Sequence, residues 1–252
     1  MRRALAPLIS ILLLASCRTS EVSPIALAAP PPPAVVRSSS SPAATVAAPN
    51  GTVVAQPLHQ VLNVWQEPGP GARLQTQLWS GNGFHQRIRF PVVSRFRDVG
   101  GTSWLKVPLP ERPNGSTGWI RSQDVTLSRV QDRILVDLSA RRLVRFRDGE
   151  RVLRLRVGVG SDGYPTTTGR FFVWAKVDYP DDQGAYGAFA LGLSGFSRVI
   201  TDWVGGGRLA IHGTTDPLDR GRAVSHGCVR VYNPELTALI DVPMGTPVRI
   251  RP

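Results

Sequence analysis

The residue of this chain most able to act as a nucleophile is Cys228, because the only other cysteine, Cys17, lies in an apolar leader. Two of the four histidines, His212 and His226, lie close to it in the sequence. A neutral imidazole can accept a thiol proton, and the resulting thiolate attacks carbonyl carbons. We therefore expect a neighbouring imidazole to hold Cys228 ionised. The alternative is a small, buried, inert side chain.

The residues around Cys228 predict how a substrate would be held. Gly227 has no side chain, so the amides of Gly227 and Cys228 are expected to face an oxyanion. If this stretch is extended, His226 and Arg230 point to the same face as Cys228. The planar guanidinium of Arg230 suits a carboxylate. The pattern therefore predicts a substrate with a carboxylate close to the bond that is cleaved.

The same residue types could instead bind zinc. The ligands would be His212, His226 and Cys228, with Asp216 or Asp219 as the fourth. Structural zinc sites, however, usually show paired ligands at short spacing on both sides. A glycine-rich match to dinucleotide-binding loops at residues 158–163 is followed by turn-forming residues and not by the helix that it needs. We therefore expect neither a metal nor an organic cofactor.

Residues 129–252 predict the domain that positions this chemistry. Short apolar runs alternate with polar residues and are separated by Gly and Pro, which is typical of strands. The expected strands are Arg133–Leu138, Arg141–Phe146 as its hairpin partner, Val152–Val159, Phe171–Val177, Leu209–His212 and Pro247–Ile250. One helix is expected over Asn233–Ile240, with Asn233 as cap and Pro234 in the first turn. This is a mainly β, sandwich-like domain with a single short helix.

Residues 56–128 predict a separate small barrel of about five strands. Its apolar runs, separated by turn sequences, are Val61–Trp65, Arg87–Phe90, Trp104–Val107 and Gly118–Ile120. Leu62-Asn63-Val64 before Pro68-Gly69-Pro70-Gly71, and the closing Gly118-Trp119-Ile120, resemble the bacterial Src-homology-three-like domains of cell-wall proteins. The resemblance implies either recognition of wall peptide or a plain spacer.

The first 55 residues predict export and tethering. Residues 1–17 contain two arginines, an apolar run and Leu14-Ala15-Ser16-Cys17, which resembles a bacterial lipobox with Cys17 as the lipidated residue. Residues 18–55 are rich in Pro, Ala and Ser and cannot build a core, so we expect an extended tether. These features place the protein in the cell envelope, periplasmic or at the outer surface, and anchored to a membrane through Cys17.

The formal net charge is +12, and Lys106 and Lys176 are the only lysines, so arginine supplies nearly all the positive charge. Such a surface favours anionic envelope polymers or lipid headgroups. The alternative is an even spread of arginines over solvated faces. No recognition motif for nucleic acid is present, so we expect no nucleic-acid partner. We expect a monomer.

A longer pattern carries a specific resemblance. His212-Gly213-Thr214, followed after a loop by Ser225-His226-Gly227-Cys228-Val229-Arg230, resembles the catalytic signature of the L,D-transpeptidases of bacterial peptidoglycan. Residues 165–171 and 188–195 also fit that domain. The resemblance implies that Cys228 is the nucleophile and His212 its base, oriented by the Gly213 carbonyl. It implies further roles around them: His226 and Gly227 shape the oxyanion pocket, Ser225 supports them, and Arg230 and Thr214 contact substrate.

The reaction implied by this resemblance acts on peptidoglycan stem peptides. Cys228 attacks the amide before the terminal D-alanine of a tetrapeptide stem, D-alanine leaves, and an amine of a second stem resolves the thioester into a cross-link. Water in place of that amine would make the protein an L,D-carboxypeptidase. A non-enzymatic alternative is a tethered wall-binding lipoprotein in which Cys228 is inert.

Overall fold

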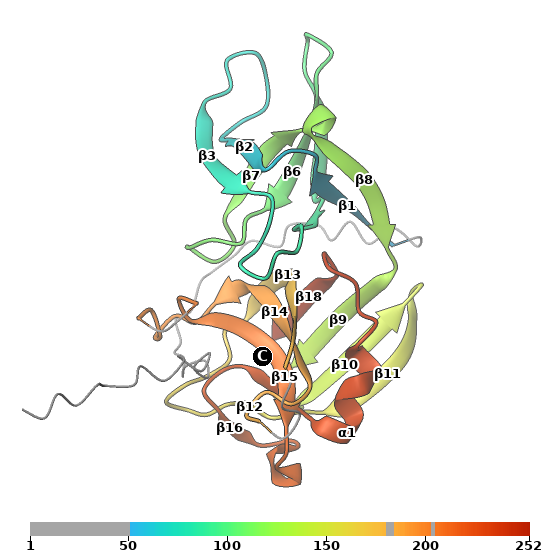
Figure 1. Cartoon of the computed structure of the whole chain (residues 1–252), viewed down its shortest axis with the longest axis vertical. Coiled ribbons are helices and arrows are strands. Elements are labelled where there is room, and N and C mark those ends of the chain that lie inside the picture. The colour runs from blue at the N-terminus through green and yellow to red at the C-terminus, as the bar shows by residue number, and fades with distance from the viewer. Residues whose placement is uncertain (1–50, 180–183, 203–204) are drawn as a thin grey trace, which may run out of the picture.

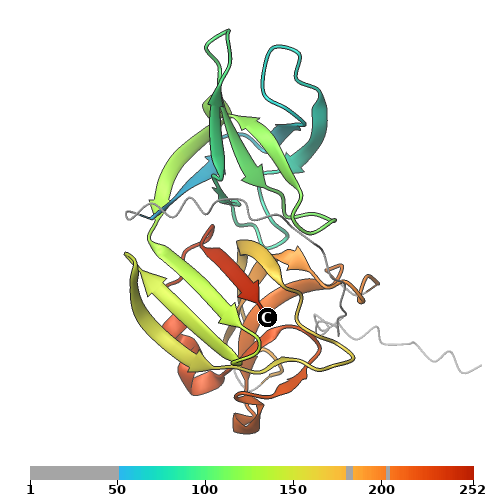
Figure 2. The same cartoon turned by 180° about the vertical axis from the view of Figure 1, so that it is seen from behind.

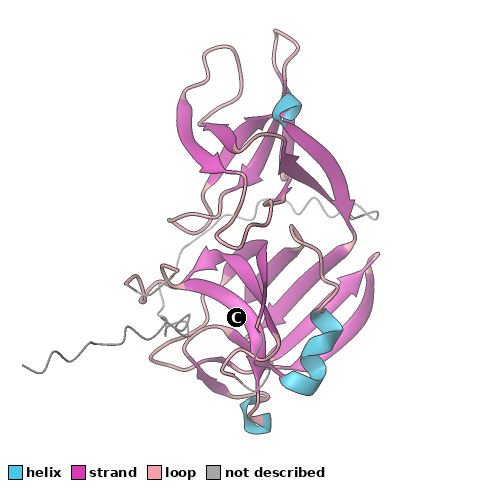
Figure 3. Cartoon of the chain, viewed as in Figure 1, coloured by secondary structure: helices cyan, strands magenta, loops and turns pink. Residues whose placement is uncertain are grey.

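The computed structural model describes residues 51–179, 184–202 and 205–252, which form two β-rich units, one above the other in Figure 1. Strands dominate both units and the helices are short (Figure 3). The mainly β fold class predicted from the sequence is therefore confirmed. The predicted leader with Cys17 and most of the tether lie outside the described residues. The predicted end of the tether at residue 55 is wrong, because residues 52–55 belong to strand β1 (Thr52–Pro57), where Val54 and Ala55 are buried in the first unit. Among the residues that are described, no helix is long and apolar enough to cross a bilayer.

The first unit contains two antiparallel sheets. Its elements are β1 (Thr52–Pro57), β2 (Val61–Trp65), β3 (Leu74–Trp79), β4 (Phe90–Pro91), β5 (Ser94–Arg97), β6 (Ser103–Pro108), β7 (Thr117–Arg121), the 3-10 helix η1 (Ser122–Asp124) and β8 (Val125–Val130). The strand orders are β3-β2-β7-β6-β5 and β4-β1-β8. Alternate residues such as Leu62, Val64 and Ile120 point inward and are buried, as a half-exposed strand requires.

Three of the four runs predicted as strands in this unit are strands β2, β6 and β7. The prediction for Arg87–Phe90 is wrong, since only Phe90 belongs to a strand, β4. Arg87 forms an isolated bridge with Gly81, and the Ile88 amide donates to the Ser80 carbonyl at 2.8 Å. Residues 80–88 therefore close a local loop before β4 begins.

The second unit is built on one eight-stranded sheet. Its elements are β9 (Asp132–Asp137), β10 (Arg142–Arg147), β11 (Glu150–Arg156), β12 (Val159–Gly160), β13 (Gly169–Asp178), β14 (Phe189–Phe196), β15 (Arg208–Thr214), η2 (Pro217–Asp219), β16 (Ala223–Ser225), β17 (Val229–Tyr232), α1 (Asn233–Leu236), η3 (Thr237–Leu239) and β18 (Pro247–Arg251). The sheet order is β11-β10-β9-β18-β13-β14-β15-β17, and β12 pairs with β16. The last strand, β18, lies between β9 and β13, so the chain ends in the middle of the sheet.

The predicted hairpin at the start of this unit is confirmed as β9 and β10, which pair with Val136 opposite Leu143. The predicted strand at Pro247–Ile250 is confirmed as β18. Apolar side chains from all the long strands meet on one side of the sheet. Core members include Ile134, Val136, Leu143, Phe171, Leu191, Ile211, Val229, Leu236 and Ile250. This core fixes the register of β15 and β17, because a one-residue slip would turn their apolar side chains to the opposite face.

The helix predicted after β17 is present but shorter in its α-helical part than predicted. Residues 233–236 are α-helical and residues 237–239 form a 3-10 turn. The predicted cap at Asn233 is wrong: Tyr232 is the capping position, and Asn233 lies in the first turn beside Pro234. Leu236 and Leu239 are buried in the core, which holds this short helix against the sheet.

The two units lie directly against each other (Figure 2). Both apolar and polar contacts join them. Phe172 of β13 is fully buried among residues of the first unit and lies 6.0 Å from Phe90 between ring centroids. Arg112 donates from Nη1 to the Ser197 carbonyl at 2.7 Å and from Nη2 to the Gly206 carbonyl at 2.7 Å. The first unit therefore holds the end of the β14–β15 hairpin that lies away from His212.

Candidate active site

Two neighbouring parallel strands bring His212 and Cys228 to the same part of the sheet. β15 and β17 pair with Ile211 opposite Val229 and His212 opposite Arg230. Cys228 immediately precedes β17, and the backbone of Ala210, two residues before His212, hydrogen-bonds its thiol. The thiol therefore lies beside β15, close to the position of His212 on that strand.

The turn before Cys228 differs from the sequence prediction. Residues 226–228 form a bend and not an extended strand, with Gly227 at φ +104°. His226 is exposed whereas Cys228 is buried, so the two side chains do not share a face. A positive φ at this position is suited to glycine. The expectation based on strand alternation is therefore wrong at His226.

Ser225 holds this turn together through its side chain. Its hydroxyl accepts a hydrogen bond from the Gly227 amide at 2.9 Å and donates to the Cys228 carbonyl at 2.6 Å. The Gly227 amide is therefore already occupied, and the expectation that it faces an oxyanion is wrong in this structure. Ser225 itself is buried, so water does not compete for these two hydrogen bonds.

His212 has a defined tautomer. Its Nδ1 lies 2.7 Å from the Gly213 carbonyl oxygen, which can only accept, so Nδ1 carries the proton and Nε2 is an acceptor. Burial lowers the pKa of His212 to about 4, which keeps the ring neutral at pH 7. The Gly213 amide donates to the Tyr186 carbonyl at 2.6 Å. Gly213 thus fixes the imidazole on one side and the segment of Tyr186 on the other.

The thiol of Cys228 is neutral in this structure. The residue is 8 % exposed, and burial raises the pKa of the thiol to about 11, although the Ala210 amide and Arg230 act in the opposite direction. In the described part of the chain, the thiol and the His212 ring share no hydrogen bond. The expectation of a resting thiolate held by the imidazole is therefore wrong, and the two groups form a neutral thiol and a neutral base.

This protonation state predicts slow alkylation of Cys228 at neutral pH. In the full chain with Cys17→Ala, iodoacetamide should modify Cys228 at a rate that rises with pH up to about 11. In the same chain unfolded by urea, the rate should level off near the ordinary thiol pKa of about 8.5. Intact-mass measurement of both pH profiles provides the comparison. A rate in the folded chain that levels off below pH 7 would show a resting thiolate instead.

Arg230 is oriented by a carboxylate that the sequence analysis did not assign to this role. Asp219, in η2, is 5 % exposed and lies 3.2 Å from the Arg230 Nη1 through its Oδ2. The Thr214 hydroxyl donates to the same Oδ2 at 2.8 Å. The Arg230 Nε is buried and has no hydrogen-bond partner among the described residues. Thr214 and Asp219 thus fix the guanidinium beside Cys228 while part of its fork stays unpaired.

Two tyrosines that no sequence motif identifies lie near the thiol. Tyr179 and Tyr186 stack with ring centroids 5.0 Å apart, and the Tyr186 ring meets His212 edge-on at 5.0 Å. Burial raises the pKa of both tyrosines, and both lie close enough to Cys228 for a thiolate charge to act in the same direction. On the exposed side, Tyr164 packs against His226 at 5.0 Å. Their signal in the sequence was weak, because isolated tyrosines in loops carry no spacing pattern.

The zinc site considered from the sequence is not present. Among residues 51–179, 184–202 and 205–252, no three His, Cys, Asp or Glu side chains are placed to hold a metal ion. Asp219 is bonded to Thr214 and Arg230, and Asp216 accepts from the Leu218 amide at 2.8 Å. These acidic side chains therefore have structural partners of their own.

Gly213 provides a test of the positioning of His212. A Cβ at this position would overlap Asn233 Oδ1 and lie 2.8 Å from the Gly187 Cα, so the Tyr186–Gly187 segment would have to move. We expect Gly213→Ala to lower turnover by about 10²-fold through a misplaced imidazole. Gly163→Ala, whose added Cβ meets nothing within 4 Å, is the matched control. Full activity in Gly213→Ala would show that this contact does not position the base.

Comparison with known proteins concerns the part of the chain that carries this site. The sequence profile of the YkuD family, the L,D-transpeptidase catalytic domain, matches residues 131–250. This segment belongs to the L,D-transpeptidase catalytic domain family. The match covers the whole second unit up to β18, including both strands that carry the candidate site.

Individual relatives cover this same part of the chain. The YkuD protein of Bacillus licheniformis, named as an L,D-transpeptidase, is 33 % identical over 121 residues, which are 48 % of this chain and 66 % of that protein. The YkuD protein of Bacillus subtilis is 28 % identical over 149 residues, 56 % of this chain and 83 % of the relative. A crystal structure of a mutant Enterococcus faecium L,D-transpeptidase has a TM-score of 0.37 at 24 % identity, with 48 % of this chain and 50 % of that chain covered. The chain thus spans half of that enzyme and just under two thirds of the Bacillus licheniformis relative.

Proposed function

We propose that this protein is an exported cysteine L,D-transpeptidase that acts on peptidoglycan stem peptides, with Cys228 as nucleophile and His212 as general base. The observation that carries the proposal is the hydrogen bond from His212 Nδ1 to the Gly213 carbonyl at 2.7 Å. It leaves Nε2 as a proton acceptor on the strand beside Cys228. Membership of residues 131–250 in the transpeptidase domain family supports the reaction class.

The neutral pair defines how the first step proceeds. The Cys228 proton passes to His212 Nε2 as Sγ bonds to the carbonyl carbon of the donor amide. The C–N bond then breaks, and the D-alanine amine leaves with the proton from His212. The thiol and the ring share no hydrogen bond before substrate arrives, so the contact must form on binding, as catalytic contacts often do. Because both partners are neutral at rest, no buried ion pair has to be maintained between turnovers.

The second step regenerates the thiol. An amine of an acceptor stem attacks the thioester, His212 Nε2 takes its proton, and the released Cys228 sulfur recovers a proton from the ring. Water would give the carboxypeptidase reaction through the same thioester. The burial of Cys228, which is 8 % exposed, favours the amine, since a site closed to bulk water limits hydrolysis.

The residues around the pair have proposed supporting roles. Arg230, held by Asp219, binds a carboxylate of the donor stem through the exposed part of its guanidinium, since its side chain is 28 % exposed. Ser225 fixes the Gly227 turn, and His226 lies on the exposed side of that turn, where it can line the substrate path. Thr214 acts on substrate indirectly, because its hydroxyl donates to Asp219.

The rest of the chain sets where the reaction takes place. We propose that Cys17 is lipidated, that the segment between Cys17 and β1 is a tether, and that the protein acts in the cell envelope, as a monomer. The β1–β8 unit is proposed as a Src-homology-three-like domain that binds wall peptide or serves as a spacer. Its contacts with β13 and β14 support a unit that moves together with the catalytic domain.

Incubation of the full chain with a disaccharide-tetrapeptide tests the proposal, with mass spectrometry of the products. We expect loss of D-alanine together with a cross-linked dimer. Loss of D-alanine without dimer would indicate a carboxypeptidase. An unchanged substrate, with the folded chain retained on purified peptidoglycan, would indicate a wall-binding lipoprotein.

A further inference from the structure

The outer strands of the large sheet gather arginines on one face. The register pairs Arg142 with Arg156, Val144 with Arg154, and Phe146 with Arg151 across β10 and β11. The intervening residues Leu143 and Leu155 are buried in the core. The outward partners therefore share the opposite face of the sheet. We call Arg142, Arg151, Arg154 and Arg156 the arginine face.

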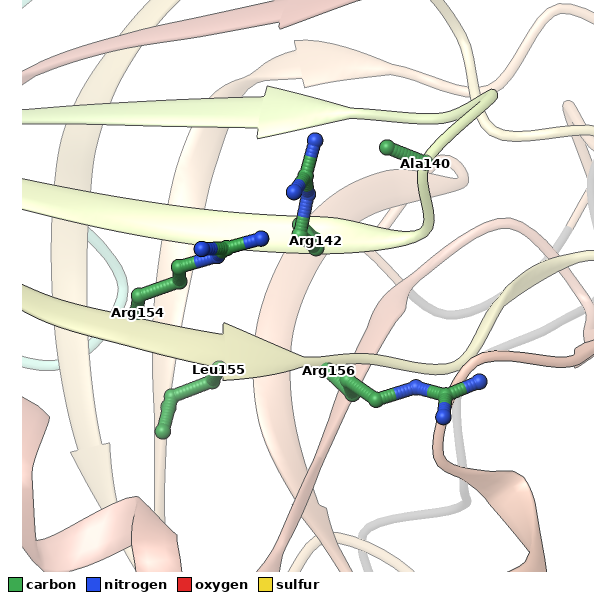
Figure 4. Close-up of a pocket in the computed structure, with 5 residues that line it drawn as sticks. All are labelled: Ala140, Arg142, Arg154, Leu155 and Arg156. Carbon is green, nitrogen blue, oxygen red and sulfur yellow. The ribbon is translucent and has the colours of Figure 1, made fainter.

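This face is hollowed. An open groove of about 490 Å³ is lined by Ala140, Arg142, Arg154, Leu155 and Arg156 (Figure 4). Figure 4 shows Arg142 on one strand and Arg154 and Arg156 on the neighbouring strand. A second hollow of about 240 Å³ shares Arg142 and Arg154 and includes the apolar side chains of Val144 and Phe146. The two hollows have these two lining residues in common and therefore lie side by side on β10 and β11.

The charge of the arginine face is balanced only in part, because Asp137 of β9 is the direct cross-strand neighbour of Arg142 but its carboxylate is paired with Arg251. None of its four members forms an ion pair with a described residue. The nearest acidic side chain lining the hollows, Asp137, is bonded to Arg251 at 2.7 Å. Arg142 and Arg156 are direct cross-strand partners, an arrangement that is unfavourable for like charges. A bound anion would relieve this repulsion.

We propose that the arginine face binds a linear, phosphate-bearing polymer of the cell envelope. A guanidinium fork matches phosphate oxygens in a bidentate manner. Outward residues repeat at about 6.6 Å along a strand and about 4.8 Å between strands, so the backbone positions that carry the arginines form short rows along which an extended chain of phosphodiesters can lie. The proposal concerns a binding surface and does not depend on the reaction proposed above.

Other occupants fit the face less well. A hollowed surface does not match a planar bilayer. Single-stranded nucleic acid needs aromatic stacking platforms, but the Arg133 guanidinium lies 3.5 Å from the ring centroid of Phe146. Residues 1–50 hold four arginines and one acidic residue, Glu21, so this segment of the chain is not complementary in charge.

The arginine face leads toward the candidate active site. Two residues beyond Arg156, Gly158 exchanges two backbone hydrogen bonds with Arg230, each of 2.8 Å. The Gly221 amide donates to the Val157 carbonyl at 3.1 Å, which ties the loop after Asp219 to the same strand end. A polymer on the arginine face would therefore lie beside the loop that orients Arg230, and would hold the protein on envelope material next to its site.

The test measures binding of a short synthetic poly(glycerol phosphate) to the full chain carrying Cys228→Ala. We expect Arg142→Gln/Arg154→Gln to weaken binding at least tenfold and to reduce the slope of log affinity against log salt by roughly one to two. Arg73→Gln/Arg95→Gln removes the same charge from exposed positions of the first unit and should change affinity less than about threefold. Thermal unfolding of each variant confirms that it is folded.

A variant that keeps the charge separates the effect of bidentate guanidinium contacts from that of net charge. It also replaces Arg142→Gln/Arg154→Gln if that double variant fails to fold. Arg142→Lys/Arg154→Lys should bind a fewfold more weakly than the parent, because lysine lacks the bidentate fork. The proposal is overturned if this pair binds like the parent or if both glutamine pairs weaken binding equally. It is also overturned if phosphatidylglycerol vesicles, a single-stranded oligonucleotide or polyglutamate of equal charge bind the arginine face as tightly as the phosphate polymer.

Discussion

Replacement of His212 by asparagine is expected to lower transpeptidation by about 10²–10⁴-fold, the contribution typical of a general base. Asparagine can keep a donor near the Gly213 carbonyl, which His212 Nδ1 meets at 2.7 Å, but it has no counterpart of Nε2. The variant therefore removes the proton acceptor and retains the local hydrogen bond. Turnover of the disaccharide-tetrapeptide, followed by release of D-alanine, is the measurement.

His59→Asn is the matched control for this experiment, because His59 is exposed in the first unit and has no contact with the candidate site. Its turnover should equal that of the parent chain. The His212 variant should also acylate slowly, since the thiol with a pKa of about 11 then has no base to take its proton. Acylation of His212→Asn at the parental rate would exclude His212 as the base.

Replacement of Arg145 by methionine is expected to destabilise the second unit by about 3 kcal/mol, the lower end of the cost of removing one partner of a buried ion pair, because Asp132 keeps its longer contact with Arg147. Arg145 is 4 % exposed and donates to Asp132 at 2.6 Å, to Asp241 at 2.6 Å and to the Ala238 carbonyl at 2.8 Å. It joins the β9–β10 hairpin to the end of the helical segment after β17. Without it, the buried carboxylate of Asp132 loses its closest partner. Urea unfolding followed by circular dichroism measures the change.

Arg147→Met is a close control for Arg145→Met. Arg147 contacts the same two carboxylates, at 3.3 Å and 2.7 Å, but its side chain is 40 % exposed. Exposed ion pairs contribute about 0–1 kcal/mol, so this variant should be nearly as stable as the parent. The double variant Arg145→Met/Asp132→Asn should recover part of the lost free energy of unfolding, because it also removes the negative charge of the buried Asp132 carboxylate. Equal stability of the two single variants would contradict a specific role for the buried pair.

The strands of the second unit could be predicted because their alternation of apolar and polar residues is regular. β9 follows this pattern, with Ile134 and Val136 facing the core, and its hairpin with β10 was predictable because a second alternating run follows after only four residues. The turn that carries Cys228 was not predictable from alternation. Its bend depends on the side chain of Ser225, which bonds two backbone groups, and on a positive φ at Gly227.

The arginine face shows why charge clusters are hard to predict from sequence. Arg151 and Arg154 are three residues apart, so regular alternation would place them on opposite faces of the sheet. A bulge at Val152 shifts the register between β10 and β11 and brings both to the same face. Asp219 is a similar case, since its contact with Arg230 depends on how the loop between β15 and β16 folds. The positions of His212 and Cys228, in contrast, followed from the residues around them.

Mass spectrometry of the intact chain during turnover tests the central claim most directly. With a disaccharide-tetrapeptide and no acceptor amine, the parent chain should gain the mass of the donor minus D-alanine, and peptide mapping should place it on Cys228. Cys228→Ala should gain no mass and release no D-alanine while remaining folded. Release of D-alanine by Cys228→Ala, or an adduct on another residue, would contradict the account.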